Sequence, residues 1–410
     1  MGDSTTAGAP SEQQLAALVD TLAADPDRRH ELMDLLREDH AFYDQRSTTA
    51  ISRMRGWILL ALARFGLPET ALVFVLEELS TGVDAYLVAA AARALRSHPA
   101  PAAAFAPFVM RALTNVRNRD EPVSFDSYGD YAARDTGTSA VRELLATLAW
   151  LGPHAAGVLS EVEALRTLRG GLFSRTLRLD VDRAVAAIRD ADRASVPAAD
   201  SCCGVSDNIG TSSWVRDSRR DSRSIEQAVF EDHAGAAVSF QEFFRGHASI
   251  VVFFYTRCDN PLKCSLTITK LARVQKLLAT RGLDDRVHTA AITYDPGFDL
   301  PERLRRYGQD RGVRLDAGHR MLRTTDGLEA LRRHFNLGVN FIESLVNRHR
   351  IEAYILDAEG RVARSFERIA WDEQQLVDHA VQVMNEERDA TAAHAPKSGC
   401  CHRAVSSAGR

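Results

Sequence analysis

The chain of 410 residues has little cysteine, almost no lysine and no long apolar run. Six cysteines are too few to hold a protein of this length together as a disulfide-rich scaffold. The longest apolar runs, residues 85–92 and 250–255, are much shorter than the roughly 18 residues of a membrane-spanning helix. Only four lysines occur, so arginine carries nearly all the positive charge, a bias that we attribute first to genome composition.

The charge balance excludes further classes of function. The formal net charge is −4, which gives no electrostatic case for binding nucleic acid or an anionic membrane. The first ten residues lack the basic and apolar regions of a signal peptide, so we expect a soluble, cytoplasmic protein. The apolar fraction of 45% and the charged fraction of 26% are typical of globular proteins, and the length predicts two or three domains of about 150 residues each.

The N-terminal half shows helical spacing of its apolar residues from about residue 14 to residue 195. Three segments share one design, in which the apolar pattern stops at glycine or proline, and a fourth helix follows them: 54–66, 84–99, 139–153 and 177–190. Leu62, Leu95 and Leu148 occupy equivalent places in the first three segments. This half resembles HEAT-type repeats, which implies an α-solenoid that offers a surface to a protein partner. A plain helical bundle is the alternative interpretation.

Strands alternate with helices in the C-terminal half, which predicts an α/β sheet. A polar linker at residues 196–224 separates the two halves and contains Cys202 and Cys203. The predicted elements after the linker are a hairpin at 229–240, strands at 248–255, 287–293, 352–356 and 362–366, and helices at 265–280, 300–311 and 371–385.

Cys258 and Cys264 are the residues most suited to chemistry. The strand at 248–255 delivers Cys258 into a loop, and Cys264 lies at the start of the next helix. Backbone N–H groups, the helix dipole and the neighbouring Lys263 all favour a thiolate at that place. Two thiolates from one loop can cycle between dithiol and disulfide, or they can bind a soft metal such as Cu(I). The cysteines alone leave both chemistries open.

Several motifs of the C-terminal half follow one another in the order of a known family. They are Phe230–Gly235, Val252–Cys258, Thr293–Pro301, and His349 with the Tyr354 and Asp357–Gly360 that follow it. With these motifs, residues 226–386 resemble the Sco/SenC family of thioredoxin-like copper proteins. The resemblance implies a thioredoxin-like fold, and it implies that Cys258, Cys264 and His349 bind a copper ion. A neutral imidazole from His349 completes a site of two sulfurs and one nitrogen.

The chain departs from the family pattern in two ways. Five residues separate Cys258 from Cys264, whereas the family usually has three, so the wider loop could loosen the site, change its metal preference or favour a disulfide. Family members are usually anchored outside the cytoplasm, and we find no anchor in this sequence. For these reasons the copper source and the copper target of the usual members are not carried over to this chain.

The remaining candidate residues are harder to interpret. Two adjacent cysteine pairs bracket the C-terminal domain, namely Cys202 with Cys203 and Cys400 with Cys401, and His402 follows the second pair. Adjacent thiols can capture a soft metal, resolve a disulfide by exchange, or be incidental. We interpret Asp295 and Asp299 as turn and helix-start residues rather than metal ligands, and the histidines other than His349 and His402 as structural or solvated.

We therefore predict a multidomain protein with an all-α, HEAT-like N-terminal domain and an α/β, thioredoxin-like C-terminal domain. The predicted segments in chain order are a disordered lead-in (1–15), the helical domain (16–195), the linker (196–224), the Sco/SenC-like domain (225–387) and a disordered tail (388–410).

Three functions fit these segments. The favoured one is a copper metallochaperone that delivers the ion to a protein partner docked by the helical domain. The second is a thiol-disulfide oxidoreductase that uses Cys258 and Cys264 and depends little on His349. The third is a regulatory or scaffold protein whose C-terminal domain senses metal or redox state. His349 favours the first function over the second, whereas the target, the direction of copper or electron transfer and the oligomeric state stay open.

Overall fold

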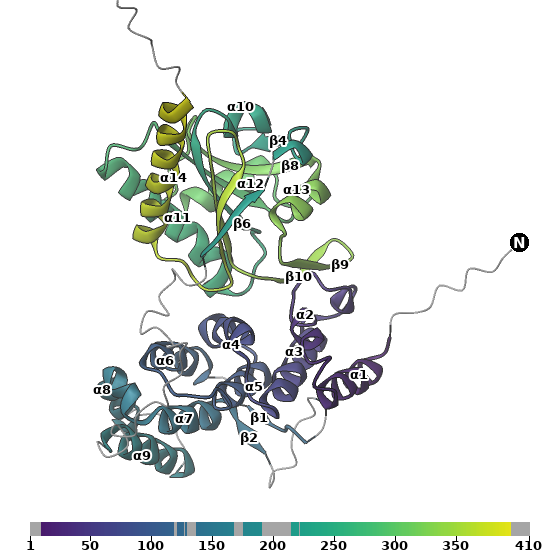
Figure 1. The fold of residues 1–410 in the computed structure, drawn as a ribbon, viewed down its shortest axis with the longest axis vertical. Helices are drawn as coiled ribbons and strands as arrows, with labels where there is room; N and C mark the ends of the chain where they lie inside the picture. The colour runs from purple at the N-terminus through teal and green to yellow at the C-terminus, as the bar shows by residue number, and fades with distance from the viewer. Residues whose placement is uncertain are drawn as a thin grey trace, which may run out of the picture.

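A computed structural model describes residues 10–118, 121–126, 128, 137–167, 175–190, 215–220 and 222–394 of the chain. Helices form the N-terminal region, and a mixed β-sheet with surrounding helices forms the C-terminal region (Figure 1). Each region has its own large cluster of buried apolar side chains. The structure thus confirms a helical N-terminal region and a C-terminal mixed-sheet domain, and the sheet is consistent with a thioredoxin-like fold.

The N-terminal region consists mainly of helices that pack against one another. They are α1 (Glu12–Ala24), α2 (Glu31–Asp34), α3 (Thr48–Ala63), α4 (Glu69–Thr81), α5 (Ala85–Leu95), α6 (Ala106–Val116), α7 (Ala140–Leu151), α8 (Leu159–Ala164) and α9 (Arg175–Arg189), with 3₁₀ segments at Ala41–Tyr43, Ala103–Phe105, Gly152–Val158 and Leu165–Thr167. Side chains of Ser47, Asp84 and Ser139 accept backbone N–H bonds at the starts of α3, α5 and α7, as N-cap residues do. That these helices are HEAT-type repeats stays a prediction.

The stretch between α6 and α7 differs from an all-α domain. The strands β1 (Pro122–Val123) and β2 (Thr138–Ser139) pair in antiparallel fashion there. A two-residue strand is too short to show the alternating pattern of apolar and polar residues by which a strand is recognised. This pair is therefore not predictable from the sequence.

Helix α4 is not among the helical segments predicted from the sequence. It lies beside the C-terminal region (Figure 1). It begins directly after Pro68, whose fixed backbone suits a helix start. Every residue from Ala71 to Thr81 is buried, including the charged pair Glu77 and Glu78. Buried carboxylates require partners, and both glutamates find cations in the C-terminal region, while Glu78 also pairs with Arg55 of α3.

The C-terminal region is built on an eight-stranded mixed sheet in the order β3-β12-β11-β6-β7-β8-β4-β5. Its strands are β3 (Val215–Arg220), β4 (Val229–Asp232), β5 (Ala237–Ser239), β6 (Ala248–Phe254), β7 (Val287–Thr293), β8 (His319–Asp326), β11 (Glu352–Leu356) and β12 (Val362–Glu367). Strands β6, β7 and β8 are parallel, and the remaining pairs are antiparallel. All seven residues of β6 are buried, as its continuous apolar run predicts for an inner strand.

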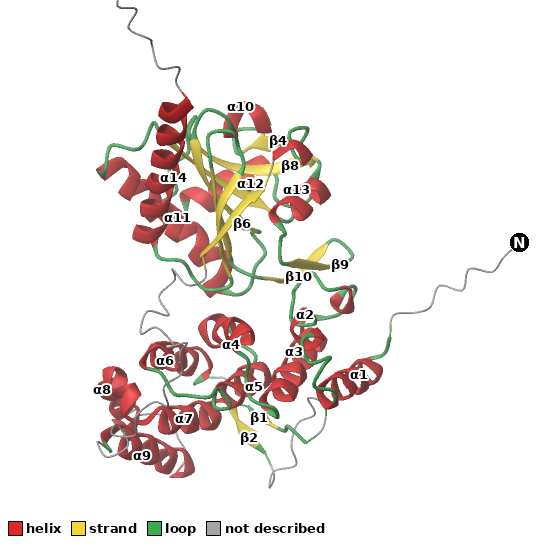
Figure 2. Ribbon diagram, viewed as in Figure 1, coloured by secondary structure: helices red, strands yellow, loops and turns green. Residues whose placement is uncertain are grey.

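Helices cover the sheet, as Figure 2 shows by colour. They are α10 (Phe240–Phe244), α11 (Leu266–Thr280), α12 (Pro301–Gln309), α13 (Leu328–Phe335) and α14 (Glu373–His394). Helices α11 and α14 lie side by side, and both pack against β6. In the part of the chain that the structure describes, none of the helices has both the length and the apolar character needed to cross a membrane.

A separate hairpin connects the sheet to the helical region. Strands β9 (Val339–Ile342) and β10 (Leu345–His349) pair only with each other, and in Figure 1 they lie between the sheet and helices α2 and α3. The Asn347 amide on β10 donates to the carbonyl oxygens of Tyr43 at 3.2 Å and Arg46 at 3.0 Å. The Gln45 N–H donates to the carbonyl of Phe341 on β9 at 3.2 Å. These bonds dock the hairpin onto the helical region.

Candidate metal centre

The loop after β6 positions the two central cysteines. Cys258 lies in the loop itself, and Cys264 lies in a π-helical turn at Pro261–Ser265 that leads into α11. The turn begins at Asn260, whose side chain accepts the N–H of Leu262 at 3.0 Å. The expected helix start therefore contains an extra π-helical turn, a feature that is frequent at functional sites.

His349 reaches the same place from a distant part of the sequence. It is the last residue of β10 and is paired with Val339 of β9. Its Nε2 lies 3.5 Å from Sγ of Cys258 and 3.5 Å from Sγ of Cys264. All three donor atoms lie within 4.8 Å of one another, so the three residues named from the sequence come together in one group that could hold a metal ion.

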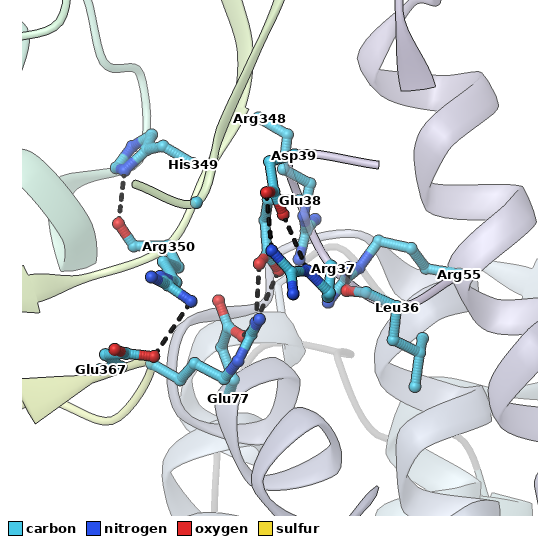
Figure 3. Close-up of polar contacts among 12 residues, drawn as sticks. Leu36, Arg37, Glu38, Asp39, Arg55, Glu77, Arg348, His349, Arg350 and Glu367 are labelled. Carbon is cyan, nitrogen blue, oxygen red and sulfur yellow. Dashed lines mark hydrogen bonds and ion pairs between the residues drawn. The ribbon is translucent and has the colours of Figure 1, made fainter. Parts of the chain in front are cut away.

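A backbone bond orients the His349 ring. Its Nδ1 lies 3.0 Å from the carbonyl oxygen of Arg350, as Figure 3 shows. Because a carbonyl oxygen only accepts, Nδ1 carries a proton, and Nε2 is the ring atom that faces the two sulfurs. Nε2 can donate to the Cys258 thiolate when it is protonated and can bind a metal ion when it is not. This is the arrangement by which protein histidines are oriented toward a bound metal.

The donors differ in their exposure to solvent. Cys264 is 1% exposed and His349 is 5% exposed, whereas Cys258 is half-buried. Cys258 and His349 line a cavity of about 280 Å³ between the two regions of the protein. Thr48, Ser52 and Asp84 contribute to the opposite wall of this cavity from the helical region. An ion or a reactive group therefore approaches the centre from the Cys258 side.

The two thiols titrate as a pair. A hydrogen bond from the Cys264 thiol, together with His349, holds the pKa of Cys258 well below its ordinary value, although burial opposes this shift. Burial and the neighbouring Cys258 sulfur raise the pKa of Cys264 well above the ordinary thiol value. Cys258 is therefore the thiolate at neutral pH, and Cys264 keeps its proton until a stronger electrophile, such as a metal ion, competes for the sulfur.

Two aspartates support the loop without joining the donor group. The Asp299 carboxylate accepts from the Thr256 N–H at 3.1 Å and from the Thr293 hydroxyl at 2.5 Å, so it joins the ends of β6 and β7. It does not cap α12, whose N-cap is Leu300, so its expected role at the helix start is replaced by this bridging role. Asp295 pairs with Arg257, the residue before Cys258.

Two aromatic side chains cover the ring of His349. The Tyr255 ring meets it edge-on with centroids 5.4 Å apart, and the Tyr294 ring lies 5.6 Å away. Both tyrosines are largely buried, and burial raises the pKa of each phenol well above its ordinary value. They stay neutral at physiological pH and shield the imidazole from water. The Tyr255 contribution was not predicted, although its place three residues before Cys258 could have suggested it.

The other predicted thiols lie outside the described residues. They are Cys202, Cys203, Cys400 and Cys401, and His402 is outside them as well. Their roles therefore stay predictions. Within the described part of the chain, the other histidines form no metal-binding group with neighbouring cysteines or carboxylates.

A comparison with models of known protein families confirms the resemblance seen in the motifs of the C-terminal half. The SCO1/SenC family model matches residues 217–385, which span the C-terminal domain. The match includes Cys258, Cys264 and His349. A comparison with curated proteins finds no match to the chain.

Several solved structures are similar to part of this chain. A SCO1/SenC family lipoprotein from Bacillus anthracis is 21% identical, covers 38% of this chain and 92% of its own, and gives a TM-score of 0.33. Arabidopsis thaliana ScoI with copper bound is 20% identical, covers 40% of this chain and 99% of its own, and gives 0.33. Yeast Sco1 with copper bound is 22% identical, covers 40% of this chain and 91% of its own, and gives 0.32.

Proposed function

We propose that the SCO1/SenC domain of this chain binds one copper ion through Cys258, Cys264 and His349. The observation that carries the proposal is the convergence of the three donor atoms within 4.8 Å, from two segments far apart in the sequence. Each element has a local reason to hold its donor: the π-helical turn for Cys264 and the Arg350 carbonyl for His349. The centre therefore needs little rearrangement to accept an ion.

The donor set favours Cu(I) over a structural zinc ion. Thiolate sulfur and imidazole nitrogen suit both metals, but structural zinc sites almost always have four protein ligands. In the described residues, the group contains three potential ligands and no fourth histidine, cysteine or carboxylate. A site of two sulfurs and one nitrogen, buried on one side and open at Cys258, suits a soft ion that must later leave.

The finer proposal is that the protein is a metallochaperone and that copper is its cargo. Such a protein must release the ion to a protein partner, and the half-buried Cys258 is the donor that a partner's thiol or imidazole can reach first. The helical region forms the opposite wall of the cavity at Cys258. A partner that receives the ion therefore contacts the helical region while it approaches the centre, as a docking role for that region requires.

Anaerobic titration of the reduced protein with Cu(I), against a competing chelator, tests copper binding. The expected result is one tightly held ion per chain, lost on Cys258→Ala, Cys264→Ala or His349→Ala substitution. His154→Ala, a change at an exposed histidine of the helical region, is the matched control and leaves binding unchanged. A variant with serine at the four outlying cysteines must also keep the ion. Copper held only by those outlying pairs, or no tight binding at all, sinks the proposal.

A second function rests on the unequal thiols. The lowered pKa of Cys258 makes it a nucleophile, and the protonated Cys264 beside it is placed to resolve a mixed disulfide. In that reaction the Cys258 thiolate attacks a substrate disulfide, Cys264 displaces the substrate thiol, and the substrate is reduced as the cysteines become a disulfide. Turnover with a dithiol reductant that survives His349→Ala substitution would favour this function over copper transfer.

The cytoplasmic location expected from the sequence stays a proposal. A copper-transfer role through two free thiols suits a reducing compartment, where an ordinary disulfide is kept open. Fractionation of cells that produce the full chain, with detection of the protein in each compartment, checks it, and recovery outside the cytoplasm would contradict it.

A further inference from the structure

All three ligand-bearing segments contact the last turns of helix α4. Asn260, two residues after Cys258, donates its side-chain amide to the carbonyl oxygen of Thr81 at 2.8 Å. Lys263, the residue before Cys264, forms an ion pair with Glu77 at 3.7 Å. Thus two of the five residues between the cysteines reach across to the helical region.

The third contact lies beside the histidine. Arg348, the residue before His349, forms an ion pair with Glu78. Glu78 also accepts hydrogen bonds from the buried Arg55 of α3, with 2.9 Å between the carboxylate and the nearer guanidinium nitrogen. Although burial raises its pKa, the charges of Arg348 and Arg55 outweigh this effect and hold the pKa of Glu78 below the ordinary value. Glu78 is therefore ionised and able to hold Arg348 at neutral pH.

Lys263 joins two of these contacts. Its ammonium group donates to the carbonyl oxygen of His349 at 2.7 Å, while it faces Glu77 on its other side. Glu77 is held in turn by Arg368 at 2.8 Å, and Arg368 also pairs with Glu38. One cation thus ties the segment of Cys264 to the strand of His349. Figure 3 shows the histidine strand on one side of this network and the segments of the helical region that carry Glu38, Glu77 and Arg55 on the other.

From this pattern we infer that helix α4 is part of the metal centre and that Glu77 and Glu78 are its positioning residues. They touch none of the donor atoms, but they fix the cations next to Cys264 and His349, and the Thr81 carbonyl fixes the loop of Cys258. The inference deepens the proposed function and rests on it. It assigns to the helical region a role in holding the three donors at the spacing that a small ion requires.

Five substitutions test the positioning role in the full chain. Glu77→Gln and Glu78→Gln remove one charge each at nearly constant shape. Lys263→Met removes the cation but keeps the aliphatic stem, and Lys263→Arg restores a cation. Glu69→Gln is the matched control on the same helix, because Glu69 lies at the exposed start of α4, where it pairs with His98.

The readouts are the absorption and electron paramagnetic resonance spectra of the Cu(II)-loaded protein and the Cu(I) affinity by chelator competition. We expect Glu77→Gln, Glu78→Gln and Lys263→Met to keep one ion per chain, with a shifted spectrum and an affinity lower by about 10- to 100-fold, the usual effect of losing an outer partner of a metal ligand. Lys263→Arg should return the spectrum toward that of the unmodified protein. Spectra and affinities equal to those of Glu69→Gln would overturn the inference.

A substitution that changes no charge tests the inference if a glutamate variant fails to fold. Asn260→Ser keeps an oxygen that can accept the Leu262 N–H but is too short to reach the Thr81 carbonyl. It should shift the copper spectrum while circular dichroism and the melting temperature stay close to those of the unmodified protein. An unshifted spectrum in this folded variant would count against positioning by α4.

A copper-free readout separates this inference from the proposed function. The rate of Cys258 alkylation by iodoacetamide in the apo protein depends on the places of Cys264 and His349 beside it. If the unmodified protein binds no copper, the proposed function fails, yet the alkylation rate still tests positioning. We expect it to change at least several-fold in Lys263→Met and to stay unchanged in Glu69→Gln, and equal rates would overturn the inference.

Discussion

At the scale of single residues, Cys258 and Cys264 share one centre but differ in burial and protonation. Cys258 is half-buried and has a lowered pKa because Cys264 donates a hydrogen bond to it and His349 lies beside it. Cys264 is buried and has a raised pKa. The order in which the thiols react follows from this difference: Cys258 meets an incoming ion or disulfide, and Cys264 follows.

The lowered pKa of Cys258 predicts a flat pH profile for its alkylation. In a variant with serine at the four outlying cysteines, the iodoacetamide rate should change little between about pH 6 and about pH 9, because the thiolate is already formed. An ordinary thiol, with a pKa of about 8.5, would react at least 10-fold faster at the upper end. His349→Ala should restore part of that rise. A rate in the unmodified centre that climbs like that of a free thiol would contradict the assignment.

Asp299 gives a second prediction at this scale. Its carboxylate accepts three hydrogen bonds, two from Thr256 and one from Thr293, and it is fully buried. Asp299→Asn places an NH₂ group against one of these donors, so the free energy of unfolding should fall by about 1–3 kcal/mol. Denaturant unfolding measures the change. Asp310→Asn, at an exposed site after α12, should change it by less than about 0.5 kcal/mol.

At the scale of elements, the β9–β10 hairpin carries His349 and also docks on the helical region. Asn347, two residues before the histidine, is the main polar link. Asn347→Ala leaves the buried carbonyl of Tyr43 and the part-buried carbonyl of Arg46 without this donor, at a cost of about 1–3 kcal/mol. Amide hydrogen exchange should then accelerate in both β10 and residues 43–48.

A change elsewhere in the same hairpin controls for a general effect on its stability. Leu345 on β10 is 46% exposed, and Leu345→Ala removes apolar surface without touching the helical region's carbonyls. Leu345→Ala should leave the rate of amide hydrogen exchange in residues 43–48 unchanged. If Asn347→Ala accelerates exchange in β10 alone, the hairpin is held by its own pairing rather than by the contact with the helical region.

The elements that could be predicted from the sequence are those with a local signal. The buried run of β6 and the cysteines after it were recognisable, because the pattern and the chemistry lie within a few residues of each other. The contacts of α4 were not, since Glu78 and Arg348 are 270 residues apart, and Glu77 and Arg368 are 291 apart. The two adjacent glutamates directly after the apolar run 71–76 were the one visible sign that α4 faces buried cations.

At the scale of the whole molecule, buried charges join the two regions, and Ile369 of the C-terminal region packs into the apolar cluster of the helical region. Arg348, Arg368 and Lys263 of the C-terminal region face Glu38, Glu77 and Glu78 of the helical region. Breaking a buried ion pair by removal of one partner costs about 3–5 kcal/mol, because a charge is left without compensation. The regions therefore stay associated at neutral pH, yet their association depends on the ionisation of the carboxylates.

Acid should consequently separate the two regions. Burial disfavours the ionised forms of Glu38 and Glu78, but the neighbouring arginines outweigh it and hold the pKa of both carboxyls below the ordinary value. A carboxyl with a lowered pKa in the folded state adds stability above its ordinary pKa of about 4.3, and this stability is lost as the pH falls below that value. The radius of gyration from X-ray scattering should stay constant from about pH 8 to about pH 5 and rise only below about pH 4.

Glu78→Gln provides the matched variant for this transition. It removes one of the carboxylates that acid would neutralise, so part of the separation should already be present at neutral pH, and the remaining step should be smaller. Circular dichroism recorded on the same samples distinguishes separation of folded regions from unfolding, because only unfolding removes the helical signal. If the unmodified protein keeps its radius of gyration down to the pH at which its helices unfold, the interface does not depend on these carboxylates.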